Sequence, residues 1–107
     1  MKLKPGEFSK IVCQLALQIP PGRVTTYGLL TQSAGGHPML ARMITAVLSK
    51  SPDVDKIPFH RIVYSDGRVW LDPKYAKKRL KLYEQEGIKL DKNHRIINFD
   101  NLVFTFD

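Results

Sequence analysis

The apolar residues of the N-terminal third recur at helical spacing. They fall at i, i+3, i+4, i+7 and i+11, where one stripe along a helix would place them. These positions are Phe8, Ile11, Val12, Leu15 and Ile19. The run Pro20-Pro21-Gly22 ends the predicted helix, because proline cannot continue the hydrogen-bond ladder and glycine favours a turn.

Residues 24–50 predict a short strand followed by two helices. Val24-Thr25-Thr26 is β-branched, and Thr26 is suited to cap a helix over residues 27–34. A sharp turn at residues 35–38 leads to a second helix over 39–50. The apolar face of that helix is predicted to comprise Leu40, Met43, Ile44, Val47 and Leu48.

Two short helices joined by a glycine-containing turn suggest a helix-turn-helix. The other face of the second helix carries small or basic residues, namely Ala41, Arg42, Thr45 and Ser49. Such a face fits closely into a DNA groove, or it is an ordinary solvated face. Periodicity alone does not decide between the two.

The second half of the chain predicts a hairpin and a further helix. Residues 61–64 and 68–71 are strand-like runs on either side of Ser65-Asp66-Gly67, a strong hairpin signal. Pro73 is suited to open a helix that ends at Gly87. The residues of this helix predicted to face inward are Ala76, Leu80 and Tyr83.

Residues 96–99 and 102–106 predict a final hairpin around Asp100-Asn101. A helix-turn-helix followed by a hairpin is the winged-helix plan. The predicted fold class is therefore mainly α with small β wings, a winged helix-turn-helix DNA-binding domain. The 107 residues suffice for a single domain, 1–107, and a monomer is expected.

Charge favours a polyanionic partner. The net charge is +7 and the pI is about 9.7. The densest basic run comprises Lys74, Lys77, Lys78, Arg79 and Lys81. This run is either a solvated helix face or a set of phosphate contacts, which would add salt-dependent affinity.

Several kinds of site are excluded by composition. A single cysteine, Cys13, precludes an intrachain disulfide and is expected to be a buried packing residue. The three histidines lack metal-ligand spacing, so neither a metal nor a cofactor is predicted. No apolar run approaches the length of a membrane span, and the N-terminus lacks a secretion signal. An intracellular location is expected.

Three segments together resemble the C-terminal domain of the alkylguanine-DNA alkyltransferases. They are Pro21-Gly22-Arg23-Val24-Thr25-Thr26-Tyr27-Gly28, Gly36-His37-Pro38-Met39-Leu40-Ala41-Arg42 and Pro58-Phe59-His60-Arg61-Ile62-Val63. The resemblance covers residues 8 to about 88, in the family's order and with similar spacing. Residues 89–107 form an extension beyond it.

The third segment departs from the family at the reactive residue. In the enzymes a cysteine thiolate takes the alkyl group from guanine O6, activated by a histidine with a glutamate behind it. The resemblance places Phe59 at the cysteine position, His60 at the histidine and Glu86 at the glutamate. Ser51 stands where the family has an asparagine. A phenyl ring cannot accept an alkyl group, so no transferase activity is expected, and His60 is expected to form a hydrogen bond in the core.

The chain is similar to the cysteine-less branch of the family, the alkyltransferase-like proteins, which typically carry tryptophan where Phe59 stands. The resemblance implies binding to double-stranded DNA that contains O6-alkylguanine, flipping of the damaged base into a pocket, and transfer of the lesion to nucleotide excision repair proteins. The partners implied are therefore DNA and those repair proteins.

Residue roles follow from the same resemblance. Arg42 corresponds to the arginine finger that replaces the flipped base, and Tyr27 to the tyrosine that rotates the target phosphate. Other residues implied at the DNA interface are Thr25, Thr26, Gln32, Ser33 and Ala41. The implied lesion pocket comprises Leu48, Phe59, Trp70 and Lys74; packing of the wing is an equally good interpretation of Trp70. Arg61 is expected to anchor the wing.

A winged-helix transcription regulator that reads undamaged DNA is the alternative function. Such a regulator needs several base-reading side chains on its second helix. Only Arg42 is a strong reader there.

Overall fold

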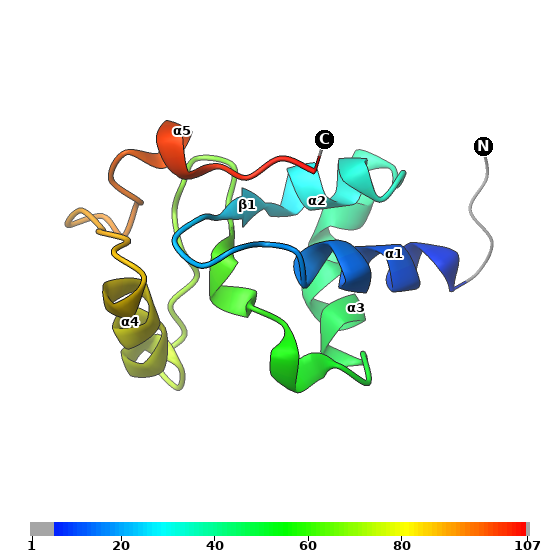
Figure 1. The fold of residues 1–107 in the computed structure, drawn as a ribbon, viewed down its shortest axis with the longest axis horizontal. Helices are drawn as coiled ribbons and strands as arrows, with labels where there is room; N and C mark the ends of the chain where they lie inside the picture. Colours follow the sequence, from blue (N-terminus) through cyan, green and yellow to red (C-terminus); the bar gives the residue numbers. More distant parts are fainter. Residues whose placement is uncertain (1–5, 107) are drawn as a thin grey trace.

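The structure is a computed structural model that describes residues 6–106 (Figure 1). Three helices, α1 (Glu7–Ala16), α2 (Tyr27–Ser33) and α3 (Ile44–Ser49), pack together at one end, and α4 (Ala76–Gln85) lies at the other. Strands β1 (Thr25–Thr26) and β2 (Ile62–Val63) join the two ends. The predicted domain spans 1–107, of which residues 1–5 and 107 lie outside the described part.

The first two helices confirm the sequence pattern. α1 buries Val12 and Ala16, and it ends before Ile19, which is buried in the following turn. α2 begins after Thr26, whose Oγ1 accepts a hydrogen bond from the Leu29 amide at 3.0 Å. Thr26 thus satisfies one of the free amide groups that a helix start leaves unpaired.

The predicted helix over residues 39–50 is wrong in its first half. The structure has a 3₁₀ helix, η1 (Pro38–Met43), which then passes into α3. Pro38 starts this tight helix, and a turn of three residues places side chains in a different phase from an α-helix. As a consequence Met43 is 50% exposed, whereas Ile44 and Leu48 are buried as predicted.

The sheet is parallel and pairs segments distant in sequence. Thr25 lies opposite Ile62, and Thr26 opposite Val63. The turn of the predicted hairpin of residues 61–64 with 68–71 is present, since the Gly67 amide donates to the Tyr64 carbonyl at 2.9 Å and the Tyr64 amide donates to the Arg68 carbonyl at 3.0 Å. Beyond this turn the strands take other partners, because β2 pairs with β1 and Arg68 also bridges to Arg95. The predicted wing is therefore reduced to a turn.

The predicted C-terminal hairpin is also wrong. Residues 99–102 form a short helix, α5 (Phe99–Leu102), and the chain then runs beside the residue before β1. The Val24 amide donates to the Leu102 carbonyl at 3.0 Å, and the Arg23 guanidinium donates to the carbonyls of Leu102 and Val103. The extension therefore packs on the domain (Figure 1).

α4 begins at Ala76, not at Pro73, which lies in the preceding turn. Its end matches the prediction, because Gly87 follows in the left-handed region with φ +74°. The inward face differs from the predicted one. Leu80 is 44% exposed, whereas Arg79 is half-buried and Tyr83 is buried.

The buried residues form two clusters. One lies among α1, α2 and α3 and extends to Ile57 and Ile62; the other lies between α4 and the C-terminal segments. Two further 3₁₀ turns, η2 (Val54–Lys56) and η3 (Phe59–Arg61), lie between α3 and β2 along the chain. The mainly helical fold class is confirmed, with a two-stranded parallel sheet in place of wings.

No helix among residues 6–106 is both long and apolar enough to span a bilayer. Within the same residues, no three histidine, cysteine or acidic side chains lie close enough together to hold a metal ion.

Candidate functional site

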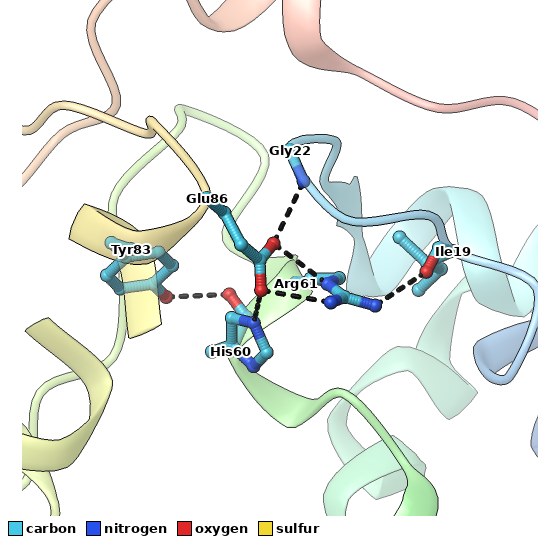
Figure 2. Close-up of polar contacts among 6 residues, drawn as sticks. All are labelled: Ile19, Gly22, His60, Arg61, Tyr83 and Glu86. Atoms are coloured by element: carbon cyan, nitrogen blue, oxygen red, sulfur yellow. Dashed lines mark hydrogen bonds and ion pairs between the residues drawn. The ribbon is translucent and has the colours of Figure 1, made fainter. Parts of the chain in front are cut away.

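Glu86, at the C-terminus of α4, joins its own helix to two other segments of the chain through its carboxylate (Figure 2). Arg61 donates to both carboxylate oxygens, from Nε and Nη2, at 2.9 Å each. The Gly22 amide donates to Oε1 at 2.9 Å, and His60 Nε2 contacts Oε2 at 2.5 Å. Arg61 Nη1 extends the network to the Ile19 carbonyl. We call this group of contacts the Glu86 clamp.

The clamp fixes the ionisation of its members. Burial disfavours the charged form of Glu86, but donation from Arg61, Gly22 and His60 outweighs it and lowers the pKa of Glu86 to about 2. The carboxylate is therefore an acceptor at neutral pH, so the proton shared with His60 is on Nε2. Burial lowers the pKa of His60, with Arg61 adding to that effect, and His60 is neutral at pH 7.

A second contact holds the backbone of His60. The buried Tyr83 hydroxyl donates to the His60 carbonyl at 2.7 Å (Figure 2). Burial raises the pKa of Tyr83 to about 12, so the hydroxyl keeps its proton. His60 is thus oriented from both its ring and its backbone, which confirms its predicted hydrogen-bonded place in the core. Arg61 is a structural anchor, although it binds the clamp and not a wing.

A pocket of about 280 Å³ opens beside the clamp. One of its lining residues, Phe59, directly precedes His60 in the sequence. It is lined from the N-terminal half by Tyr27, Ala41, Arg42, Thr45 and Leu48, and from the second half by Phe59, Ile62, Tyr64, Trp70 and Arg79. The parallel pairing of β1 with β2 brings these halves together, because Tyr27 follows β1 while Ile62 lies in β2. The pocket is concave and combines apolar side chains with hydroxyl and guanidinium groups, as binding sites commonly do.

Six of the predicted site residues meet in this pocket. They are Tyr27, Ala41, Arg42, Leu48, Phe59 and Trp70. Burial raises the pKa of Tyr27, so its hydroxyl is protonated and able to donate. Gln32 and Ser33 are exposed on α2, where solvent or a ligand can reach them. Their predicted contacts with DNA stay predictions.

Four other predicted positions need correction. Thr25 is fully buried, and the Thr26 hydroxyl caps α2, so neither is placed for phosphate contact. The Ser51 hydroxyl accepts from the Asp53 amide at 3.1 Å and serves the loop, not the clamp. Lys74 does not line the pocket; it is exposed, with Nζ 5.4 Å from the Tyr75 ring centre.

Sequence reasoning missed the cation that does line the pocket, Arg79. Its guanidinium carbon lies 4.9 Å from the Trp70 ring centre. The positions Ala76, Arg79, Tyr83 and Glu86 share one face of α4 at spacings of three and four residues. Following that phase from Glu86, instead of assigning Leu80 to the core, would have identified Arg79. Tyr64, Thr45 and Ile62 were also missed as lining residues.

Cys13 lies on α1 and lines a different cavity, with Leu17 and Met43. It is half-buried and packs against the N-terminal cluster, which is close to its predicted role. It is not among the residues that line the pocket beside the clamp.

Comparison with known proteins shows the same architecture elsewhere. A relative from Vibrio parahaemolyticus named "DNA base-flipping protein" is 33% identical over 74% of this chain and 78% of its own length. One of the same name from Escherichia coli is 31% identical over 87% and 71%, respectively. The crystal structure of S. pombe Atl1 in complex with damaged DNA containing O6-carboxymethylguanine covers 98% of this chain and 99% of its own, with a TM-score of 0.75 and 23% identity.

At that identity, the likeness to the S. pombe protein shows the fold alone. The family rests on the sequence match, since the profile of the 6-O-methylguanine DNA methyltransferase DNA binding domain aligns with residues 7–88. The chain therefore belongs to the 6-O-methylguanine DNA methyltransferase family, whose DNA binding domain makes up most of it.

Proposed function

We propose that this chain is a non-enzymatic sensor of O6-alkylguanine in double-stranded DNA. In this proposal the chain binds DNA as a monomer, flips the damaged base into the pocket beside the Glu86 clamp, and presents the lesion to nucleotide excision repair proteins. One observation carries the proposal: Phe59 lines the pocket directly beside a His60–Glu86 pair that has no thiol to activate.

The chemistry of Phe59 supports binding without alkyl transfer. An alkyl acceptor needs a nucleophilic lone pair, and activation of a thiol needs a base within hydrogen-bond reach. Phe59 offers only an apolar ring, and His60 already directs its Nε2 proton to Glu86. The pocket therefore retains surface for a flat base but lacks the reacting atom.

The placement of Tyr27 and Arg42 supports base flipping. Extruding a base from a duplex costs a few kcal/mol, which must be offset by contacts to the flipped state. Arg42 is exposed on η1 and lines the pocket, and in this proposal its side chain enters the duplex in place of the flipped base. Tyr27 lines the same pocket with a protonated hydroxyl that can donate to a phosphate. All of these residues come from one chain, which agrees with a monomer.

The proposal predicts preferential binding to damaged DNA. At fixed salt, a duplex with one O6-methylguanine should bind at least about tenfold more tightly than the unmodified duplex, a difference of about 1.4 kcal/mol. Fluorescence anisotropy with both duplexes measures it. Equal affinities would contradict the sensor function and favour a regulator of undamaged DNA.

The same experiment tests the absence of chemistry when the methyl group carries a radioactive label. After prolonged incubation the label should remain entirely on the DNA, while an active alkyltransferase run in parallel becomes labelled. The variant Cys13→Ser serves as a control for adventitious labelling of the single thiol. Label on the wild-type protein that persists in this variant would show that another residue accepts the alkyl group.

A lesion that is bound but chemically unchanged must be removed by other proteins, and this reasoning supports the proposed excision partners. Addition of the chain should raise the rate at which reconstituted nucleotide excision proteins incise a duplex with one O6-methylguanine. Incision of an unmodified duplex is the control. An unchanged or lower incision rate would contradict the proposed hand-off.

A further inference from the structure

The pocket beside the clamp is lined by positive charge without a matching negative one. Of the described residues that line it, two are arginines, Arg42 and Arg79, and none is an aspartate or glutamate. A third arginine, Arg68, does not line the pocket but contacts one of its lining residues, with its guanidinium carbon 4.9 Å from the Tyr64 ring centre. Clefts lined by one sign of charge attract ligands of the opposite sign.

Arg79 is held in the pocket by the Trp70 ring and by a side-chain hydrogen bond with Tyr83, not by an acid. Its guanidinium lies over Trp70, and its position on α4 between Ala76 and Tyr83 directs its stem along the helix face that packs inward. None of the ion pairs formed among residues 6–106 involves Arg79. Its Nη1 atom is buried without a hydrogen-bond partner in this part of the chain.

A buried donor without a partner is unfavourable, and it marks a place where a ligand acceptor would fit. The charge of Arg79 also reaches the neighbouring groups of the site. Burial raises the pKa values of Tyr27 and Tyr83, and the Arg79 guanidinium opposes that rise in both. Burial lowers the pKa of His60, and Arg79 adds to this effect. The positive charge of Arg79 therefore acts on Tyr27 in the pocket and on the buried His60 and Tyr83 behind it.

We propose that Arg79 makes this pocket selective for O6-alkylguanines whose alkyl group carries an anionic oxygen, such as a carboxylate. The inference rests on the proposed function, since it assumes that the flipped base enters the pocket. A carboxylate would accept from the unpaired Nη1 proton and neutralise a charge that the pocket leaves unbalanced. A charge-assisted hydrogen bond of this kind is about twice as strong as a neutral one.

Two adducts of nearly equal shape provide the test. O6-carboxymethylguanine carries a carboxylate, and O6-carbamoylmethylguanine replaces it with a neutral amide. The wild-type chain should bind a duplex with the carboxylate adduct about tenfold more tightly than the amide duplex, as expected for a hydrogen bond between charged groups. Competition titration at fixed salt gives the ratio of the two Kd values directly.

Two variants test whether Arg79 causes the difference between the two Kd values. In Arg79→Gln the ratio should fall to about one, because the side chain keeps amide donors but loses its charge. Lys78→Gln removes one positive charge from the exposed neighbour of Arg79 on α4. It should weaken binding to both duplexes by the same factor, so the ratio of the two Kd values is unchanged. Thermal unfolding of both variants checks that the fold is intact.

The outcomes separate this inference from the proposed function. If the chain does not distinguish either adduct from unmodified guanine, the sensor function itself fails. If both adducts bind more tightly than guanine but equally well in the wild-type chain, selectivity for anionic groups is refuted. If the wild-type ratio persists in a folded Arg79→Gln variant, another group reads the carboxylate and Arg79 does not.

Discussion

Replacing Glu86 with glutamine should lower the free energy of unfolding by about 3 kcal/mol or more, since removing one partner leaves a buried charge uncompensated. The Glu86 side chain is only 10% exposed, and it accepts four hydrogen bonds from three residues, Gly22, His60 and Arg61. A glutamine keeps the shape but presents one acceptor oxygen and an amide that clashes electrostatically with the Arg61 guanidinium. Urea denaturation of both proteins measures the difference.

Glu84→Gln is the matched control, because Glu84 lies on the same helix with an exposed side chain. A surface substitution of this kind should change the free energy of unfolding by less than about 0.5 kcal/mol. Equal, small effects of the two substitutions would show that the Glu86 clamp does not stabilise the fold.

The same variant should lose much of its sensitivity to acid. The folded pKa of Glu86 is about 2, below its ordinary value of 4.5, so its stabilisation is complete above pH 4.5 and is lost as the pH falls towards 2. The lowered pKa of His60 works in the same direction, because its stabilisation declines as the pH falls below 6.5. Between pH 4.5 and 2, unfolding of Glu86→Gln should depend less on pH than unfolding of the wild type.

Replacing Arg42 with alanine should weaken binding to an O6-methylguanine duplex by about tenfold or more, while binding to undamaged DNA falls much less. The variant would lose two contributions that Arg42 makes when the base is flipped. They are the side chain that fills the gap in the base stack and the positive charge that lines the pocket. With undamaged, stacked DNA the variant would lose only one positive charge near the phosphates, and such a loss weakens binding almost independently of sequence. Anisotropy titration with both duplexes gives the two ratios.

Lys56→Ala provides the comparison for Arg42, because Lys56 is an exposed cation on η2 that lines neither of the cavities beside α3. Lys56→Ala should weaken binding to the damaged and to the undamaged duplex slightly and by the same factor. A similar, uniform loss in Arg42→Ala would mean that Arg42 contacts phosphate without replacing a base.

Local signals in the sequence predicted local structure well. The apolar stripe through Val12 predicted α1, Thr26 predicted the start of α2, and Gly87 predicted the end of α4. Each of these signals acts within one or two turns of chain, so the residues involved determine the outcome themselves. The motif around Phe59 and His60 likewise predicted a site whose members the structure brings together.

Predictions about partners failed, because turn chemistry specifies where a chain reverses and not what it pairs with. Asp66-Gly67 does form a turn, which a hydrogen bond from the Tyr64 amide to the Arg68 carbonyl closes, but β2 pairs with β1, and Arg68 also bridges to Arg95. Arg79 was grouped with a basic run interpreted as either a solvated face or a set of phosphate contacts, because the sequence does not show that its guanidinium lies over the Trp70 ring. Burial of a long charged side chain depends on a neighbour that is distant along the chain or in another element.

The two-residue ladder between β1 and β2 also determines which changes of chain length the pocket can survive. A residue inserted among the exposed positions around Pro52 and Asp53 would leave both strands, and hence both walls, in place. A residue deleted between His60 and Ile62 would slip the pairing by one position and turn each following side chain to the opposite face. Divergent copies of this chain should therefore vary freely in that loop and hold a constant spacing from Phe59 to Val63.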